Sequence, residues 1–311
     1  MELHFERPMA IAKAAFHGLH SYRYLPMVLD AMQNDPQGEL RQAALLLLAE
    51  KDAGRKAEAV RRLSECGAPR LDSEALLQPA GAIPGQPERP LLVSPREVKK
   101  RAMHTVEGRA ALIHALVHIE FNAINLALDA IWRFPGMPEA YYSDWLRVAG
   151  EEALHFSLLS NHLKGMGYAY GDFVAHNGLW EMVEKTRGDP LARMALVPRT
   201  LEARGLDVVP AMRARLLQAG DVRAAEILDI ILHDEIGHVA IGNRWYNYLC
   251  RERGIDPIVT HALLATEYGV PPLRGPYNFS ARRAAGFCEA ELSELAGRGA
   301  CAMNMAQSDT I

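Results

Sequence analysis

Charged side chains interrupt the apolar faces of four predicted helices, and this pattern limits the fold more than any other feature of the chain. Apolar residues recur at steps of three and four from Ile113 to Ile131, from Trp145 to His162 and from Leu228 to Leu249, and a shorter stripe surrounds Leu201. A buried carboxylate without a partner is costly, so these stripes must meet something that neutralises them. The interrupting residues are Glu120, Glu152, His155, Glu202, Glu235 and His238.

The same spacing of Glu and His occurs twice. Glu152 and His155 form an ExxH pair, as do Glu235 and His238, and both side chains of such a pair can reach one ion from a helix. Chance alone predicts roughly one ExxH in a chain of this composition. However, Glu120 precedes Glu152 by 32 residues and Glu202 precedes Glu235 by 33. The sequence therefore predicts two helical hairpins, each placing a lone Glu level with an ExxH.

Packing the two hairpins face to face would bring all six side chains together. Two divalent metals would cancel the four carboxylate charges, whereas a zinc hydrolase more often shows three ligands and an open water position. A metal-bound imidazole usually donates its other N–H to a carboxylate, and Glu151 and Asp234 stand directly before the two ExxH glutamates. His162 continues the stripe of His155, so it is either an outer ligand or hydrogen-bond donor to bound oxygen, or a core histidine whose polar atoms are satisfied. Arg199 and Arg204 flank Glu202 as electrostatic partners or as anchors for an anionic substrate group.

Five long segments of the chain have a distinctive sequence: EGRAALIHALVHIEFNAINLALDAIWRF, VAGEEALHFSLL, GDFVAHNGLWEM, MALVPRTLEARGLDV and HDEIGHVAIGNRWY. On these segments the chain resembles the bacterial ferritin-like family called domain of unknown function 455, and the resemblance covers roughly residues 40 to 297. More distantly, LEARGLD is similar to a segment of the tRNA-modifying diiron hydroxylases.

This resemblance implies an all-α protein with a ferritin-like four-helix bundle and a carboxylate-bridged dinuclear metal centre. It assigns Glu120, Glu152 and His155 to one ion and Glu202, Glu235 and His238 to the other, with Glu152 and Glu235 bridging. In dinuclear iron oxygenases and reductases, the acidic residue before the ExxH glutamate often bonds the histidine of the opposite hairpin. That role falls to Asp234 first and Glu151 second.

The resemblance further implies two iron ions, with a manganese–iron pair as an alternative, and dioxygen as a co-substrate. We expect an oxidoreductase, an oxidase or monooxygenase that oxidises or hydroxylates a small-molecule or modified-nucleoside substrate. Three alternatives stay open: a ferroxidase or peroxide-scavenging ferritin-like protein, a tRNA-modifying hydroxylase, and a metal-storing bundle without turnover. The substrate, the electron donor and the role of residues 1–35 are not specified by the sequence.

The distribution of prolines and helical patterns suggests four regions. Prolines recur from Pro69 to Pro95 and forbid a regular helix there, and Ser94-Pro95 suits the start of the next helix. We expect an N-terminal helical element over residues 1–68, a connector over 69–95, the bundle over 96–255 and a C-terminal extension over 256–311. The extension should pack on the bundle, and its last residues should be disordered.

The composition and net charge of the chain limit the kinds of binding partner that we expect. The net charge of −4 and the pI near 6.3 give no global basic field for nucleic acid or anionic membrane. No apolar run is expected to span a bilayer, the start lacks a secretory pattern, and the four dispersed cysteines argue against a disulfide framework or a thiolate metal site. The chain is therefore expected to be cytoplasmic, with a homodimer as one candidate assembly.

Two segments are candidates for a substrate pocket. One surrounds Phe121 and Asn125 beside the first glutamate. The other is the stretch over residues 163–197, which should cross over the bundle and wall off the metals, although packing explains it equally well. Arg282 and Arg283 either fold back to close this pocket or form a small basic patch. The candidate residues of the crossover are Tyr168, Tyr170, Phe173, His176, Asn177 and Trp180.

Overall fold

Helices joined by turns make up the protein. The computed structural model describes residues 39–66, 70–99 and 101–297, and these contain no β-strand, which confirms the all-α prediction. The elements are α3 (Leu40–Ala49), α4 (Ala53–Glu65), α5 (Val106–Arg133), α6 (Glu139–Gly165), α7 (Gly178–Lys185), α8 (Pro190–Leu196), the π-helix η1 (Val197–Glu202), α9 (Ala203–Gln218), α10 (Val222–Arg253), α11 (Pro257–Glu267) and α12 (Phe279–Ala284).

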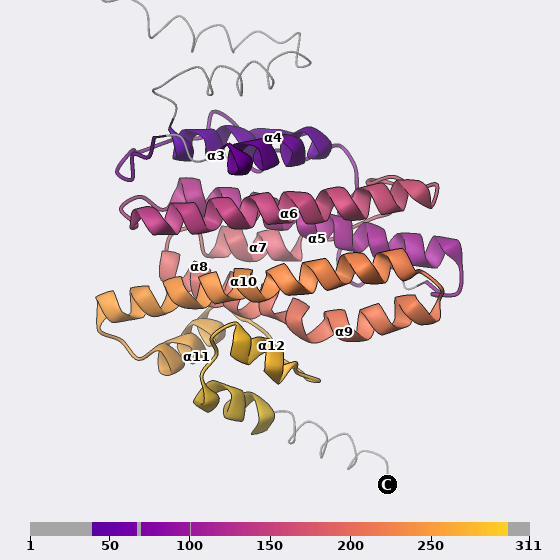
Figure 1. The fold of residues 1–311 in the computed structure, drawn as a ribbon. Helices are drawn as coiled ribbons and strands as arrows, with labels where there is room; N and C mark the ends of the chain where they lie inside the picture. The colour runs from indigo at the N-terminus through magenta and orange to yellow at the C-terminus, as the bar shows by residue number, and fades with distance from the viewer. Residues whose placement is uncertain (1–38, 67–69, 100, 298–311) are drawn as a thin grey trace, which may run out of the picture.

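Two helical hairpins form the centre of the structure. A short turn joins α5 to α6, and another joins α9 to α10. In Figure 1, α5 and α6 lie above α9 and α10, and α6 packs directly against α10. Asp221 begins α10 by accepting a hydrogen bond from the Ala224 N–H, and Gly254 ends it with a left-handed φ of 63° that a side chain would disfavour.

The N-terminal helices belong to the same core as the hairpins. Figure 1 shows α3 and α4 as a layer on the outer side of α5 and α6, and their buried apolar residues are continuous with those of the hairpins. At Gly150 of α6 an added Cβ would come within 2.4 Å of the Ser64 Oγ, so the absence of a side chain lets α4 and α6 approach closely. Residues 70–99 carry no helix, as the prolines require, but they cover this layer and do not separate two domains.

A fully buried arginine ties the layers together. The Arg41 guanidinium of α3 donates hydrogen bonds to the carbonyl oxygens of Ile131 and Trp132, which lie in the last turn of α5 where no helical N–H is available. It also donates to the carbonyl oxygens of Asp72, Ser73 and Ala75, at 2.8 to 3.2 Å. One guanidinium group therefore donates hydrogen bonds both to carbonyl oxygens at the end of α5 and to carbonyl oxygens of the proline-rich segment.

The C-terminal segment packs on the outer side of the second hairpin. A smaller apolar cluster joins Leu206 of α9 and Val239 of α10 to Ala281, Phe287 and Leu292. The buried Arg282 of α12 forms a bidentate ion pair with Asp207 of α9, at 2.7 and 3.0 Å. Predictions for residues 1–38 and for the last residues of the chain lie outside the described residues.

Two predicted helix starts are wrong. The first long helix begins at Val106, where Thr105 accepts a hydrogen bond from the Gly108 N–H, and Ser94-Pro95 lies in a turn upstream. The third does not start near Pro198 but at Pro190, capped by Asp189, and Pro198 falls inside it. Since proline lacks the N–H of a regular helical bond, the helix widens there into η1.

Helix α5 is long and apolar enough to cross a membrane by length and composition, contrary to the expectation that no segment would be. However, 78% of its most apolar window is buried inside the fold. Its apolar side chains are therefore used in packing, which is consistent with a soluble protein.

We predict that Arg41→Met will destabilise the protein by about 3–5 kcal/mol, because five carbonyl oxygens lose their donor in a buried setting. Urea unfolding followed by circular dichroism measures this loss. Arg61→Met is the matched control: Arg61 forms an exposed pair with Glu65, worth at most about 1 kcal/mol. Equal losses in the two variants would contradict the role given to Arg41.

Candidate metal centre

The first hairpin brings Glu120, Glu152 and His155 together. Glu120 on α5 and Glu152 on α6 stand at equal distances from the turn between the helices, so they lie at one level. The His155 Nδ1 lies 3.3 Å from the Glu152 Oε2 and 3.5 Å from the Glu120 Oε2. All three side chains are buried, and their ligand atoms are close enough to hold one ion.

The second hairpin adds Glu235 and His238 to the same cluster. The His238 Nδ1 lies 2.9 Å from the Glu152 Oε1 and 3.9 Å from the Glu235 Oε2. Glu152, Glu235 and His238 form a second group that could hold an ion. Glu152 therefore presents one oxygen to each histidine and belongs to both groups.

Glu202 lies near the cluster, on the segment η1 that approaches α10 closely, but it belongs to neither of the two groups of ligand atoms that the described residues form. At Gly242 of α10 an added Cβ would come within 2.5 Å of the Pro198 side chain. Gly242 lies one turn after His238, so this contact sets the distance between η1 and the ligand face of α10. Glu202 is the last residue of η1, and the charges of Glu152 and His238 act on its carboxyl group.

Several ligand atoms of this cluster make no hydrogen bond within the protein. In the described part of the chain, six buried oxygen and nitrogen atoms on five of the six residues form no hydrogen bond, although buried polar atoms nearly always do. Two of these atoms, the His238 Nδ1 and the Glu152 Oε1, lie 2.9 Å apart as a charged contact, whereas both oxygens of Glu202 have no such contact. Carboxylate oxygens and an imidazole nitrogen are the donors that divalent iron and manganese take. The residues present therefore fit a pair of metal ions. The atoms are Glu120 Oε2, Glu152 Oε1, Glu202 Oε1, Glu202 Oε2, Glu235 Oε2 and His238 Nδ1.

Each histidine is held by a carboxylate from the opposite hairpin. The His155 Nε2 lies 2.9 Å from the Asp234 Oδ2, and the His238 Nε2 lies 2.7 Å from the Glu151 Oε2. An Nε2–H that donates to these carboxylates leaves the Nδ1 lone pair of each neutral imidazole facing the cluster. Asp234 and Glu151 are partly exposed, so this side of the cluster is its edge toward solvent.

The pKa shifts of these side chains are those expected of a site that accepts added positive charge. Burial and the charge of Glu152 raise the pKa of Glu120 and of Glu202 to about 8, and the same causes raise the pKa of Glu235. Burial would lower the pKa of both histidines, but their carboxylate partners outweigh it and raise it. Without metal, protons on these groups balance the charge that two divalent ions would cancel.

The structure gives three other candidate residues of the site partners outside the cluster. His162 pairs with Asp221 at 3.0 Å, about 10 Å along α6 from His155, and so links the end of α6 to the start of α10. Arg204 donates to the Arg274 carbonyl oxygen and lies 3.4 Å from Asp207. Arg199 pairs with Glu291. In the described part of the chain, the ion pairs of both arginines are with carboxylates other than Glu202.

The proposed pocket residues of the crossover are used in packing. Tyr170 stacks near Phe121 and Phe156 and its hydroxyl lies 2.8 Å from the His118 Nδ1, while the His176 carbonyl oxygen accepts from the His118 Nε2–H. The stretch also contains α7 and α8, so it is less of a loop than predicted.

The second pocket candidate contains a residue that the sequence analysis missed. Asn125 accepts a hydrogen bond from the buried Lys56 Nζ at 2.5 Å, and Lys56 also donates to the carbonyl oxygens of Leu48 and Gly85. Burial lowers the pKa of Lys56 to about 7. Its position on the apolar stripe of α4, between Ala53 and Val60, could have revealed it. Arg282 and Arg283 form no basic patch, because Asp207 and Glu289 neutralise them.

The chain matches the family described as "Protein of unknown function (DUF455)" over residues 49–293. It is 51% identical over 230 residues to an "Uncharacterized protein" of Haemophilus influenzae, in an alignment that covers 72% of this chain and 80% of the relative. The chain therefore belongs to this family, as its sequence segments indicated. No solved structure matches it.

We predict that the metal-free protein loses stability as the pH rises from 6 toward 8. The folded state holds protons on Glu120 and Glu202 that the unfolded chain releases above its ordinary pKa of 4.5, so unfolding releases protons and a higher pH favours it. The slope is up to about 1.4 kcal/mol per pH unit for each group. Urea unfolding at several pH values measures it.

Glu202→Gln is the control for this prediction, since an amide cannot titrate. This variant should show a smaller slope than the wild type, and metal-loaded protein should show the smallest. A metal-free protein whose stability rises over the same pH range would contradict the assignment of these protons.

Proposed function

We propose that this protein is a ferritin-like dinuclear metalloprotein that uses iron and dioxygen to oxidise or hydroxylate an organic substrate. The observation that carries the proposal is the pair of adjoining Glu and His groups, sharing Glu152, at the meeting point of two helical hairpins, with several of their atoms lacking a hydrogen bond. Glu152 faces both histidines and suits a bridging role, and Glu235 lies on the other side of His238. We assign Glu120, Glu152 and His155 to one ion and Glu202, Glu235 and His238 to the other.

The donor set favours iron over the common alternatives. Four carboxylates and two imidazoles match ions of intermediate hardness, and no cysteine among the described residues belongs to the cluster. Two bound ferrous ions would supply the electrons that reduce dioxygen, and this is the chemistry an oxidase or oxygenase needs. A mixed manganese–iron pair satisfies the same ligands.

The chain's own residues prepare the site for this role. Asp234 and Glu151 accept the Nε2 protons of His155 and His238, which fixes the ring orientation and keeps each Nδ1 available as a donor. The apolar core around α5, α6 and α10 excludes bulk water from the carboxylates. The partly exposed edge at Glu151 and Asp234 is the side from which a small reactant has the shortest way in.

We predict two ferrous ions per chain in an anaerobic titration of the metal-free protein, followed by an oxygen-dependent absorption in the near-ultraviolet and visible range. Glu235→Ala should lose at least one ion and the absorption, because it removes a ligand. Glu226→Ala, on the same helix but in an exposed ion pair with Arg223, should behave as the wild type.

Binding of fewer than two ions by the wild type would contradict the dinuclear centre. Two bound ions whose spectrum ignores oxygen would leave a metal-binding protein and contradict the oxidase. Continued oxidation of added iron beyond two ions per chain would indicate a ferroxidase.

We predict that Asp234→Asn weakens metal binding about 10- to 100-fold, because the neutral amide holds the His155 Nε2–H less well. Asp229→Asn is the matched control, since Asp229 lies on the same helix and pairs with the exposed Arg213. Competition with a coloured chelator measures the affinities. Equal affinities in the two variants would show that the contact between Asp234 and His155 does not support the site.

A further inference from the structure

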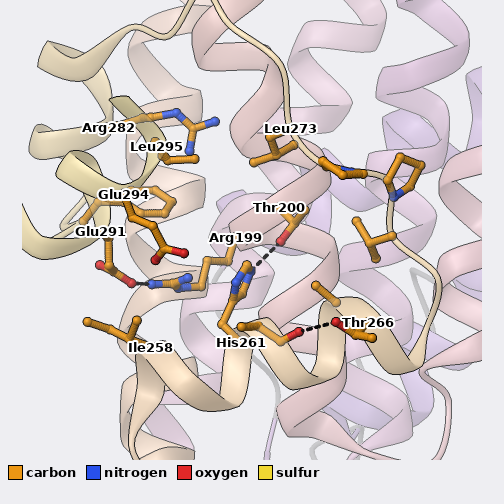
Figure 2. A pocket seen from close by; sticks show the side chains of 16 residues that line it. Arg199, Thr200, Ile258, His261, Thr266, Leu273, Arg282, Glu291, Glu294 and Leu295 are labelled. Atoms are coloured by element: carbon orange, nitrogen blue, oxygen red, sulfur yellow. Dashed lines mark hydrogen bonds and ion pairs between the residues drawn. The ribbon is translucent and has the colours of Figure 1, made fainter. Parts of the chain in front are cut away.

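A cavity of about 230 Å³ lies between η1, α11 and the C-terminal segment, separate from the carboxylate cluster. Figure 2 shows its residues: Arg199 and Thr200 of η1, His261 and Thr266 of α11, Leu273 of the following loop, and Arg282, Glu291, Glu294 and Leu295 of the C-terminal segment. We call this cavity the C-terminal pocket. Its apolar wall is formed by Ile258, Ala262, Ala265, Val270, Leu273 and Leu295.

Two buried arginines of this pocket are incompletely hydrogen-bonded. Arg199 is 5% exposed and Arg282 is fully buried. Among the described residues, the Arg199 Nε and the Arg282 Nη1 have no hydrogen-bond partner. Both guanidinium groups lie about 5 Å from the ring centre of Phe287, at 5.0 and 5.2 Å. The two arginines that have an unsatisfied N–H group therefore contact the same aromatic ring.

Two other arginines among the described residues are fully buried, and they show what a purely structural role looks like here. Arg41 donates to five carbonyl oxygens, and Arg193 donates to Thr186, Asp129 and Val183. No nitrogen of either side chain lacks a partner. Of the buried arginines that the structure describes, only the two that line the C-terminal pocket therefore keep an unsatisfied guanidinium nitrogen.

We infer that the C-terminal pocket binds a small organic carboxylate with an apolar body. A carboxylate is the planar anion that guanidinium N–H groups recognise best, and the aliphatic wall suits a hydrocarbon body. A dry cavity of about 150 Å³ can hold benzene, so 230 Å³ holds a medium-chain or aromatic acid but not a cofactor the size of a nucleotide.

Glu291 is the internal competitor for this ligand. Its carboxylate pairs with Arg199, as the dashed line in Figure 2 marks, and it is carried by residues 289–297, the helical segment that forms one wall. An incoming carboxylate shares or displaces this contact. Removing the charge of Glu291 should therefore strengthen anion binding, whereas removing the charge of Arg199 should weaken it.

The test uses the full chain and isothermal titration calorimetry, with a chelator present so that no metal–carboxylate contact contributes. The probe is octanoate, and octanol and octylammonium have the same tail with a neutral or positive head. Octanoate should bind at least about tenfold more tightly than either, the difference expected for one charge-assisted hydrogen bond. The result does not depend on the metal centre, so it can fail or succeed independently of the proposed function.

Three variants test the location. Arg199→Gln should weaken octanoate binding at least about tenfold, and Glu291→Gln should strengthen it. Ala262→Trp fills the cavity from an exposed position of α11, so it should abolish binding while the melting temperature stays unchanged. Equal binding of octanoate and octanol, preference for octylammonium, or octanoate binding that survives Ala262→Trp would overturn the assignment.

Discussion

Four carboxylates on facing helices, two buried and two partly buried, are the constraint on which the rest of this structure depends. Taking these groups out of water is unfavourable unless protons, imidazolium groups or metal ions neutralise them. Glu152 is the centre of the arrangement, because its two oxygens face the two histidines that come from different hairpins. The hairpins must therefore meet at one level, and this requirement sets the register of α6 against α10.

Close contacts between helices determine where the ligand residues lie. Gly242 lets Pro198 approach α10, and the π-helical turn around Pro198 places Glu202 at the end of η1 beside the cluster. A regular α-helix would rotate the residues after Pro198 by a different angle. The same segment carries Arg199 and Thr200 into the C-terminal pocket, so one irregular turn serves both the carboxylate cluster and the cavity behind it.

Buried cations hold the outer segments of the structure against the two hairpins. Arg41 fastens the proline-rich segment and the end of α5, Lys56 fastens α4 to Asn125, and Arg282 fastens α12 to Asp207. In each case the cation meets carbonyl or carboxylate oxygens that would otherwise lack a donor. The layers outside the hairpins are thus held by polar anchors inside an apolar core, and they shield the carboxylates from water.

The sequence alone determined the helical class, the two Glu-and-ExxH units and the carboxylates beside each histidine, because helical periodicity fixes which residues share a face. The sequence did not determine that a π-helix forms around Pro198. It also did not determine which side chains pair with the other polar groups near the site. His162 lies on the stripe of His155 yet pairs with Asp221, and Arg199 stands near Glu202 in sequence yet faces Glu291. Lys56 lies on the apolar stripe of its helix, but its partners Asn125 and Gly85 are remote in sequence and are known only from the fold. These contacts join residues far apart in the chain, so only the packing of one helix on another could decide them.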